Sequence, residues 1–409
     1  MRIVFPIHRT NYYRPLGPAI EEAVRRGDQV ECWHDWSRPR RGGKGSEFPD
    51  SQPPALAKGI RVQTFQGPAD MLRRFRSEPP DVVIALDPAP TGFQDELPTK
   101  WLWLQYSADI LFFPTADGVL ASDLLATYSP YWSTELRKRF PGSGPSGNLD
   151  TRTVPVGMPE LDVVARIDPD EVRRRFALAP GRPVVLYLPF PLRSNPRTFW
   201  LRRVFTPSTR LVQGAGAVLG RRLDYWDHVR HGWNDRRLVE SVRAFCDRAG
   251  ALLVMKSRLK DPIPRYARDL ADVALYDPSH YPPTILELLS VASLCIHAYS
   301  TSVFEAAYSA VPSLCLAPDR RDMGLPDHVL DLVHNGDLGG IYNWPGTAYC
   351  VPLRAAFDGL RRWQLADFPL DGAARKRYVE RFLGFDDGRS AGRLLDVAER
   401  LGGGRSTPR

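Results

Sequence analysis

Sequence signatures of several common enzyme classes are missing from this chain of 409 residues. No Gly-x-Gly-x-x-Gly motif follows a predicted strand and opens a helix, and no Walker A sequence occurs; the Gly-x-Ser-x-Gly stretch at residues 388–392 lies in a segment predicted as helical and follows no predicted strand. The sequence therefore supports neither NAD binding, nor NTP hydrolysis, nor the nucleophile of α/β-hydrolases. It lacks a run of about 18 apolar residues and enters a strand directly at its N-terminus. We therefore expect no transmembrane helix and no secretory signal.

Cysteine is scarce and shows no paired spacing. The five cysteines are far apart, odd in number and without a Cys-x-x-Cys motif: Cys32, Cys246, Cys295, Cys315 and Cys350. Several lie in apolar strand or helix patterns, so we expect inert, buried free thiols rather than metal ligands. Free thiols are typical of a reducing compartment, which predicts a cytoplasmic protein.

Positive charge exceeds negative charge, with 55 Lys and Arg against 47 Asp and Glu and a net charge of +8. Such a surface favours anionic partners, such as nucleotide diphosphates, phosphorylated acceptors, anionic lipid headgroups or nucleic acid. An arginine-rich chain with 38 prolines and 32 glycines is equally typical of a GC-rich genome. Charge alone therefore says little about function.

Buried strands alternate with helices along the chain. Apolar runs predict strands at residues 2–7, 30–36, 81–86 and 101–105, and a second series begins with a strand at 183–188. Alternating strands and helices are typical of doubly wound parallel sheets, whose ligands bind at the carboxyl ends of the strands. A second series of predicted helices and strands begins after about residue 165. We therefore predict an α/β protein with three parts, at residues 1–165, 166–368 and 369–409, the last being a helix and a disordered tail.

The most informative segment runs from residue 277 to residue 318. We expect a helix at 284–292, a buried strand at 293–298, the turn Tyr299, Ser300, Thr301, Ser302, and then a second helix. Small hydroxyl residues between a buried strand and a helix form a site for an anion, because free N–H groups and the helix dipole point at it. Glu305, in the first helical turn, is placed to accept hydrogen bonds from a diol. The alternative is that Ser-Thr-Ser simply caps the helix.

The order of these elements resembles the nucleotide-binding half of GT-B glycosyltransferases. UDP-N-acetylglucosamine 2-epimerases and CDP-glycerol glycerophosphotransferases show a similar pattern, and residues 385–390 (Phe-Asp-Asp-Gly-Arg-Ser) look like the closing motif of the latter. The resemblance implies two Rossmann-like domains facing a cleft, with a C-terminal helix crossing back. It also implies that Ser300, Thr301 and Ser302 hold the donor diphosphate and that Glu305 holds the ribose.

The loop after the first strand carries the candidate catalytic residues. The first 33 residues resemble the opening of many GT-B enzymes, in which a helix ends in an Arg-Gly motif, here at residues 26–30 (Arg-Gly-Asp-Gln-Val). In several inverting members a His of that loop deprotonates the acceptor, and His8 occupies this place. The alternative is that His8 only forms a hydrogen bond or contacts a phosphate. Asp87 is either a competing base, a group that orients His8, or a turn-capping residue before Pro88.

Further residues complete the predicted binding sites. The acceptor would lie near Arg9, Asn11, Tyr106 and Ser107. On the donor side, Lys256 and Arg258 follow a predicted strand at 251–255 and would stabilise the leaving diphosphate, unless they belong to a solvated basic loop. The position of His280 and Tyr281 resembles the loop that reads the nucleobase. CDP-glycerol transferases place a His-Pro near Lys256, and this chain has none.

Two other features have simpler interpretations. Asp168, Pro169 and Asp170 form an Asp-x-Asp sequence, but proline at a helix start favours an N-cap over a metal site. We therefore predict no metal and no cofactor. The segment at 190–237 is rich in arginine and aromatic residues; it could bind an acceptor or a membrane surface, but a helical cover over the domain interface is favoured.

The sequence as a whole predicts a metal-independent GT-B glycosyltransferase. It would move a sugar from a nucleotide-diphosphate donor to the hydroxyl of a glycan, lipid-linked or small acceptor, in cell-surface polysaccharide or glycoconjugate synthesis. A cytoplasmic enzyme with peripheral contact to an anionic membrane fits the composition, and no nucleic-acid partner is expected. The alternatives are an epimerase-like enzyme, whose family has Ser-Gly-Gly where this chain has Ser-Thr-Ser, a glycerophosphotransferase, or a non-catalytic binding module for nucleotides or polymers.

Overall fold

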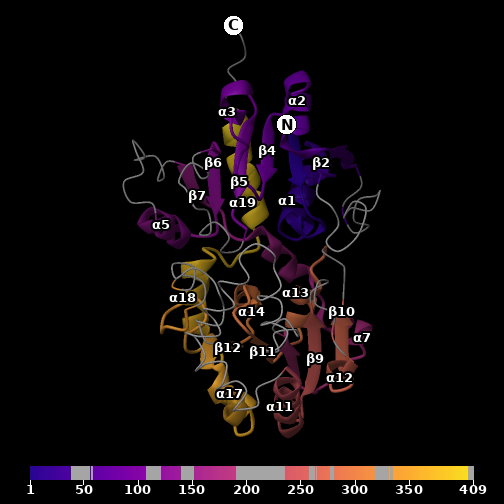
Figure 1. The fold of residues 1–409 in the computed structure, drawn as a ribbon, viewed down its shortest axis with the longest axis vertical. Coiled ribbons are helices and arrows are strands. Elements are labelled where there is room, and N and C mark those ends of the chain that lie inside the picture. Colours follow the sequence, from indigo (N-terminus) through magenta and orange to yellow (C-terminus); the bar gives the residue numbers. More distant parts are fainter. Residues whose placement is uncertain are drawn as a thin grey trace, which may run out of the picture. The chain divides into compact units, whose positions relative to one another are not determined.

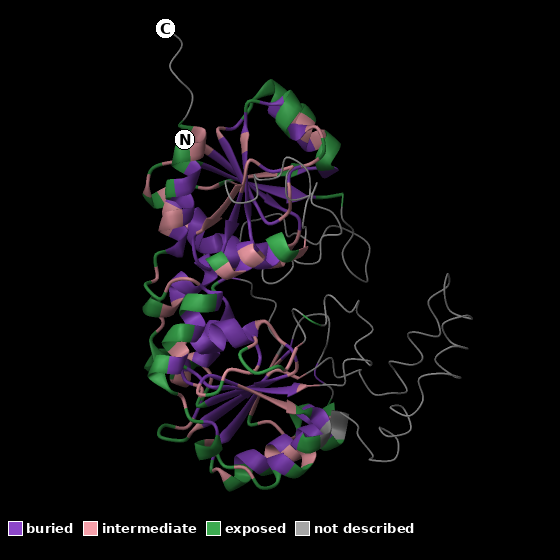
Figure 2. Cartoon of the chain, turned by 90° about the vertical axis from the view of Figure 1, so that its left-hand side faces the viewer, coloured by how far each residue is buried: buried purple, intermediate pink, exposed green. Residues whose placement is uncertain are grey.

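The computed structural model describes residues 1–37, 56, 59–106, 121–139, 152–189, 235–257, 263, 265–276, 281–317, 331 and 335–403. The chain forms two compact units (Figure 1). Unit 1 comprises Met1–Ile167, Ser279–Leu286 and Lys376–Arg409, and unit 2 comprises Asp168–Pro278 and Glu287–Arg375. In each unit buried residues fill the central strands and also occur on the helices, whereas exposed residues are frequent on the helices (Figure 2).

The sheet of unit 1 contains seven parallel strands in the order β3-β2-β1-β4-β5-β6-β7. The chain order reverses between the neighbours β1 and β4, which is where doubly wound sheets bind their ligands. The continuous apolar runs of β1 and β4 are typical of strands buried on both faces. The strand bounds are β1 (Arg2–Ile7), β2 (Gln29–Asp35), β3 (Arg61–Phe65), β4 (Val82–Ala85), β5 (Lys100–Leu104), β6 (Leu124–Thr127) and β7 (Thr153–Pro155).

Helices cover the sheet of unit 1, and the C-terminal helix α19 (Ser390–Gly402) packs against α1 (Tyr13–Arg25), β4 and β5. The predicted return of the C-terminal helix to the first unit is therefore confirmed. Buried Asp162 fixes the start of α19, because its carboxylate accepts the N–H groups of Ser390 (3.0 Å) and Ala391 (2.7 Å). The other helices here are η1 (Thr10–Tyr12), α2 (Gly67–Ser77), α3 (Phe93–Glu96), α5 (Pro130–Arg139) and η3 (Pro159–Arg166).

The sheet of unit 2 contains six parallel strands in the order β10-β9-β8-β11-β12-β13, which repeats the doubly wound arrangement with its reversal between β8 and β11. Its strands are β8 (Val184–Tyr187), β9 (Leu252–Ser257), β10 (Val273–Tyr276), β11 (Leu294–His297), β12 (Ser313–Ala317) and β13 (Ala348–Pro352). Its helices include α7 (Pro169–Arg175), α11 (Asp235–Arg248), α12 (Arg265–Arg268), α14 (Ser302–Tyr308), α17 (Leu353–Leu360) and η4 (Leu365–Asp367). Helices α13 (Thr284–Leu289) and α18 (Gly372–Phe382) run from one unit into the other.

The two-domain α/β prediction is confirmed, and the differences concern particular segments. The edge strands β3 and β13 were not predicted, because partly exposed strands mix polar and apolar residues and lose the continuous apolar signal. The predicted helix 284–292 ends earlier, at Leu289. The N-cap interpretation of Asp168 is confirmed, because its side chain accepts the N–H of Asp170 at 2.9 Å. The segment predicted as an aromatic and arginine-rich insert, 190–237, lies almost entirely outside the described residues.

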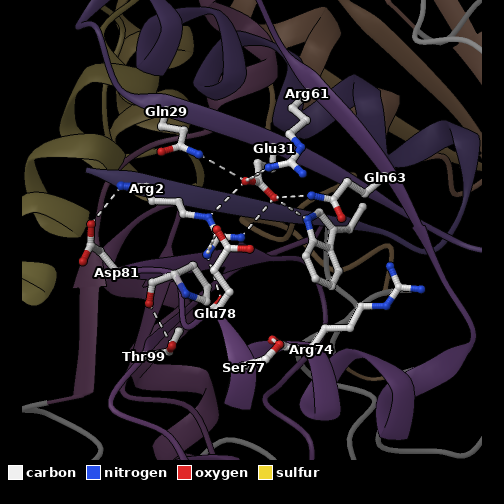
Figure 3. A network of polar contacts seen from close by, with 12 residues as sticks. Arg2, Gln29, Glu31, Arg61, Gln63, Arg74, Ser77, Glu78, Asp81 and Thr99 are labelled. Atoms are coloured by element: carbon white, nitrogen blue, oxygen red, sulfur yellow. Dashed lines mark hydrogen bonds and ion pairs between the residues drawn. The ribbon is translucent and has the colours of Figure 1, made fainter.

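A buried carboxylate joins strands at the amino-terminal end of the first sheet (Figure 3). Glu31 has no exposed surface and accepts hydrogen bonds from Arg2 Nε (3.0 Å), Trp33 Nε1 (2.9 Å) and Gln63 Nε2 (2.9 Å). Burial alone would raise the pKa of Glu31, but these donors and nearby Arg61 hold it below the usual value. Both carboxylate oxygens are satisfied, so the group ties β1, β2 and β3 together and serves the fold.

Among the described helices, none combines the length and hydrophobicity that would be needed to cross a bilayer.

Candidate functional site

Three polar side chains gather where the order of the first sheet reverses. His8 directly follows β1, Asp87 lies just after β4, and Asp35 is the last residue of β2, the other neighbour of β1. Because all strands are parallel, their carboxyl ends meet at one edge of the sheet, and polar side chains there face ligands. His8 and Asp87 were predicted from the sequence, and Asp35 was not.

The imidazole of His8 has a carboxylate on each side. Its Nδ1 lies 2.7 Å from Oδ2 of Asp35, a hydrogen bond, and its Nε2 lies 3.7 Å from Oδ2 of Asp87, beyond hydrogen-bond distance. The ring is 6% exposed and packs edge-on against Phe65 and Tyr12, with centroid distances of 5.6 and 6.2 Å. His8 is thus held in one orientation by packing and by one strong polar contact.

Asp35 has the environment of an ionised carboxylate. The group is buried, and its other oxygen accepts the N–H (3.0 Å) and the hydroxyl (2.6 Å) of Ser37. Burial acts to raise the pKa of Asp35, but the hydrogen bonds from His8 and Ser37 outweigh it and lower the pKa to about 2. An ionised Asp35 keeps the proton of neutral His8 on Nδ1, so Nε2 carries the lone pair that can accept a proton.

Asp87 differs from Asp35 in exposure and in partners. Its side chain is 35% exposed, and Oδ2 accepts the hydroxyl of Tyr12 at 3.0 Å. The residue that orients His8 through a hydrogen bond is Asp35, and Asp87 lies instead on the Nε2 side of the ring, beyond hydrogen-bond distance. From the sequence, Asp87 was a candidate both for a competing base and for the group that orients His8. The hydrogen bond that orients His8 comes instead from Asp35.

The predicted acceptor residues adjoin this group in part. The amide nitrogen of Asn11 donates to the hydroxyl of Tyr106 at 2.9 Å, and the ring of Tyr106 packs against Tyr12 at 5.8 Å. The carbonyl of Arg9 accepts the N–H of Tyr12 at 2.9 Å, which closes the short η1 turn. Asn11, Tyr12 and Tyr106 therefore form one cluster with Asp87 and His8, and Ser107 lies outside the described residues.

The second candidate site is the 299–302 turn between β11 and α14, at the reversal point of the second sheet. Tyr299 adopts a left-handed backbone conformation with φ of 41°, which is strained for a residue with a bulky side chain. Its N–H donates to Cys315 Sγ at 3.3 Å, and the N–H of Ser300 donates to His297 Nδ1 at 3.3 Å. Side chains of β11 and β12 thus hold the turn in place.

Hydroxyl groups and one carboxylate furnish the rest of this turn. Ser300 Oγ accepts the N–H of Ser302 at 3.2 Å, whereas the N-cap residue Thr301 makes no side-chain hydrogen bond to α14. Glu305 lies in the first turn of α14 and has no exposed surface.

His297, which the sequence interpretation overlooked, is the fully buried last residue of β11. Burial lowers the pKa of His297 to about 3, so the ring is neutral at physiological pH. Because Nδ1 accepts a hydrogen bond, the proton is on Nε2, which has no hydrogen-bond partner in the described part of the chain. A strand-ending His before a small-residue turn was the available sequence signal.

The remaining predicted donor residues are only partly brought together. Lys256 lies within β9, which extends to Ser257 and so runs past the predicted strand end. Tyr281 belongs to unit 1, is 6% exposed and packs its ring directly over Gly17 of α1. Its hydroxyl hydrogen-bonds Glu21, and burial raises the pKa of Tyr281. Arg258 and His280 lie outside the described residues.

Within the part of the chain that the structure describes, no three His, Cys, Asp or Glu side chains are placed to hold a metal ion together.

Comparisons with known proteins extend the description of the fold. No family model and no curated protein matches the sequence. Solved structures match along nearly the whole chain. The wall teichoic acid polymerase TagF is 13% identical, covers 98% of this chain and 89% of its own, and has a TM-score of 0.55.

Two epimerases show a similar level of likeness. A putative UDP-N-acetylglucosamine 2-epimerase from Listeria monocytogenes is 11% identical, covers 100% of this chain and 98% of its own, and has a TM-score of 0.54. A UDP-GlcNAc 2-epimerase from Neisseria meningitidis, bound to UDP-GlcNAc, is 12% identical with coverages of 98% and 100% and a TM-score of 0.53. At such identities the likeness concerns the fold. With its two doubly wound parallel units, the chain has the GT-B fold that the sequence predicted.

Proposed function

We propose that this protein is a metal-independent glycosyltransferase that moves a sugar from a nucleotide-diphosphate donor to an acceptor hydroxyl. The single observation that carries the proposal is the geometry of His8. Its Nδ1 is held by ionised Asp35, and its Nε2 faces the carboxylate of Asp87 at 3.7 Å. A histidine in this state is a general base for a hydroxyl group near neutral pH.

The reaction step assigned to His8 is proton removal. The hydroxyl oxygen of the acceptor attacks the anomeric carbon, its proton passes to Nε2, and the nucleoside diphosphate leaves with the bonding electrons. Asp35 stabilises the imidazolium that forms, since its carboxylate faces Nδ1 at 2.7 Å. The 3.7 Å separation between Nε2 and Asp87 accommodates a hydroxyl that contacts both groups.

The neighbouring side chains are assigned to acceptor binding. Asp87, Tyr12, Asn11 and Tyr106 present two carboxylate oxygens, two phenol groups and an amide within one hydrogen-bonded cluster. A polyhydroxylated acceptor needs such alternating donors and acceptors. This chemistry supports a glycan or another polyol as the acceptor, and Arg9 beside it would suit a phosphorylated one.

The donor is assigned to unit 2. The hydroxyls of Ser300, Thr301 and Ser302 would contact the diphosphate at the start of α14, and buried Glu305 would accept the ribose hydroxyls. UDP-GlcNAc bound to the Neisseria meningitidis enzyme of similar fold supports a nucleotide sugar as the ligand. Lys256 is the next-to-last residue of β9, which ends at Ser257. It would contribute positive charge near the carboxyl end of that strand.

The first experiment is a thermal-shift screen at low salt with UDP, CDP, GDP and dTDP and their sugar conjugates. A ligand that binds the native state raises the melting temperature by mass action. We expect a shift with one nucleotide diphosphate, lost in Glu305→Ala and retained in His8→Ala. Release of that diphosphate from its sugar conjugate, measured with a panel of glycan and lipid-linked acceptors and unaffected by EDTA, then tests transfer. A screen without any shift would overturn the donor assignment.

An epimerase is the second candidate, because the epimerase structures match this chain over 98% or more of both lengths. Epimerisation of a nucleotide sugar needs no acceptor, whereas transfer does. Incubation of the identified nucleotide sugar with the protein alone, followed by NMR of the sugar ring, separates the two. Inversion at C2 without acceptor would replace the transferase proposal.

A further inference from the structure

Two of the five cysteines meet in the second sheet. Cys315 of β12 and Cys350 of β13 are register partners on adjacent parallel strands, so their side chains leave the same face of the sheet. Neighbouring strands lie about 4.8 Å apart, which is within the range of Cα separations that a disulfide spans. The two thiols are hydrogen-bonded to each other in the reduced state that the structure shows.

The thiol pair is directly connected to the 299–302 turn. Cys315 Sγ accepts the N–H of Tyr299 at 3.3 Å, and Tyr299 is the residue with the left-handed backbone conformation. Its ring is 8% exposed and packs against Tyr342 at 5.1 Å. A strained conformation persists only while its surroundings hold it, so the position of one sulfur atom contributes to the shape of the turn.

The two thiols differ in access and acidity. Cys350 is on the edge strand and is partly exposed, whereas Cys315 is buried. The hydrogen bond with Cys315 lowers the pKa of Cys350, while burial and the same bond raise the pKa of Cys315. Cys32, Cys246 and Cys295 are buried, and burial raises the pKa of each to about 12. Cys350 is therefore the thiol that reacts first, and Cys315 is placed to resolve the product.

We propose that Cys315 and Cys350 form an oxidation site for hydroperoxides, and that closing their disulfide loosens the 299–302 turn. The thiolate of Cys350 attacks the peroxide oxygen, which gives a sulfenic acid and, after protonation, one water. The sulfur of Cys315 then attacks the sulfenic sulfur, the S–S bond forms, and the hydroxyl leaves with the Cys315 proton as a second water. Two thiols and one hydrogen peroxide thus yield one disulfide and two waters.

The structural consequence follows from the sulfur positions. A disulfide draws the two sulfur atoms to about 2.05 Å, much closer than hydrogen-bonded thiols. Cys315 Sγ is then pulled towards β13, and the N–H of Tyr299 loses its acceptor. Because this turn is the one assigned to the donor diphosphate, oxidation would weaken nucleotide binding. This last consequence rests on the proposed function, whereas disulfide formation and the loosened turn do not.

The test uses the full chain treated with hydrogen peroxide and then alkylated. Mass spectrometry of the non-reduced digest should find a peptide pair linking Cys315 to Cys350, with Cys32, Cys246 and Cys295 alkylated only after unfolding. Hydrogen exchange at the amide of Tyr299 should become faster in the oxidised protein and return to its initial rate after thiol reduction. Binding of the nucleotide diphosphate should fall up to about tenfold, as for one lost hydrogen bond.

The matched control is Cys350→Ser, which keeps a hydrogen-bonding group on an edge strand and removes the reactive sulfur. It should show neither the exchange change nor the binding loss after peroxide. Absence of the Cys315–Cys350 link in wild-type protein would overturn the proposal, as would a link that leaves exchange at Tyr299 unchanged. If the link and the exchange change occur while even the reduced protein binds no nucleotide, the oxidation site is supported and the proposed function fails.

Discussion

His8 and His297 lie at equivalent edges of two sheets with the same doubly wound order, yet their surroundings are opposite. His8 has a carboxylate within 2.7 Å of one nitrogen and another within 3.7 Å of the second. His297 has a backbone N–H on Nδ1, and in the described residues no partner on Nε2. The first ring contacts two carboxylates, whereas burial keeps the second ring neutral.

The difference shows what a common topology does and does not provide. Both sheets place a strand end and a following loop at the reversal point, which is the position for a ligand. The chemistry there depends on the residues that neighbouring strands contribute. Asp35 from β2 forms a hydrogen bond with Nδ1 of His8, whereas Cys315 from β12 and His297 hold a backbone turn.

The largest expected effect comes from removing the base. His8→Ala should lower turnover by roughly 10²–10⁴-fold, because general base catalysis contributes about that much. The thermal shift with the nucleotide diphosphate should persist, since no donor residue has changed. Turnover within twofold of wild type would reject the role of His8 and, with it, the contrast between the two histidines.

Removing the orienting carboxylate should have a smaller effect on the same step. Asp35→Asn should lower turnover roughly 100-fold, because a neutral amide no longer stabilises the imidazolium or selects the Nδ1 proton. The pH profile should shift as well, which a purely structural role of Asp35 would not cause. A drop in turnover with an unchanged pH profile would make Asp35 a packing residue only.

Substitutions at the donor site should change the affinity for the nucleotide rather than the rate of proton transfer. Glu305→Ala should weaken binding of the nucleotide diphosphate by about 10- to 100-fold, as expected for the loss of hydrogen bonds to a charged group. Isothermal titration measures this, and Glu305→Gln, which keeps an acceptor, should recover part of the affinity. Equal affinities in the wild type and Glu305→Ala would remove Glu305 from the site.

The smallest effect concerns stability as a function of pH. The folded-state pKa of His297 is lowered to about 3, below its unfolded value, so between these two pKa values the unfolded chain binds the additional proton. Stability should therefore fall with decreasing pH below about 6.5, by up to about 1.4 kcal/mol per pH unit for this histidine. The pKa of buried His34 is lowered to about 4, so this histidine adds a similar pH dependence of stability between pH 4 and its unfolded pKa.

The control for this prediction is His297→Asn, which keeps an acceptor for the N–H of Ser300. Urea unfolding between pH 4 and 7 should show a flatter pH dependence for this variant by about one proton. Identical slopes in the variant and the wild type would mean that His297 is protonated in the folded state. The two histidines would then differ in their partners and not in their charge.

Local features of the sequence determined the fold class and part of the site. The bounds of β1 were predicted from one apolar run, and the cap at Asp168 from a proline after an acidic residue. His8 was singled out because its loop resembles the opening of GT-B enzymes, and Asp87 because it follows a predicted strand, where ligands of such sheets bind. Each of these inferences needs only neighbouring residues, because periodicity, capping and turn chemistry act over a few positions.

The tertiary structure alone decided which distant residues meet. The partnership of His8 with Asp35 depends on β2 being the neighbour of β1, and that of Cys315 with Cys350 on the register of β12 and β13. The packing of Tyr281 against α1 of the first unit is equally non-local. Strand order and register arise from the packing of the whole sheet, so no short segment of the sequence contains them.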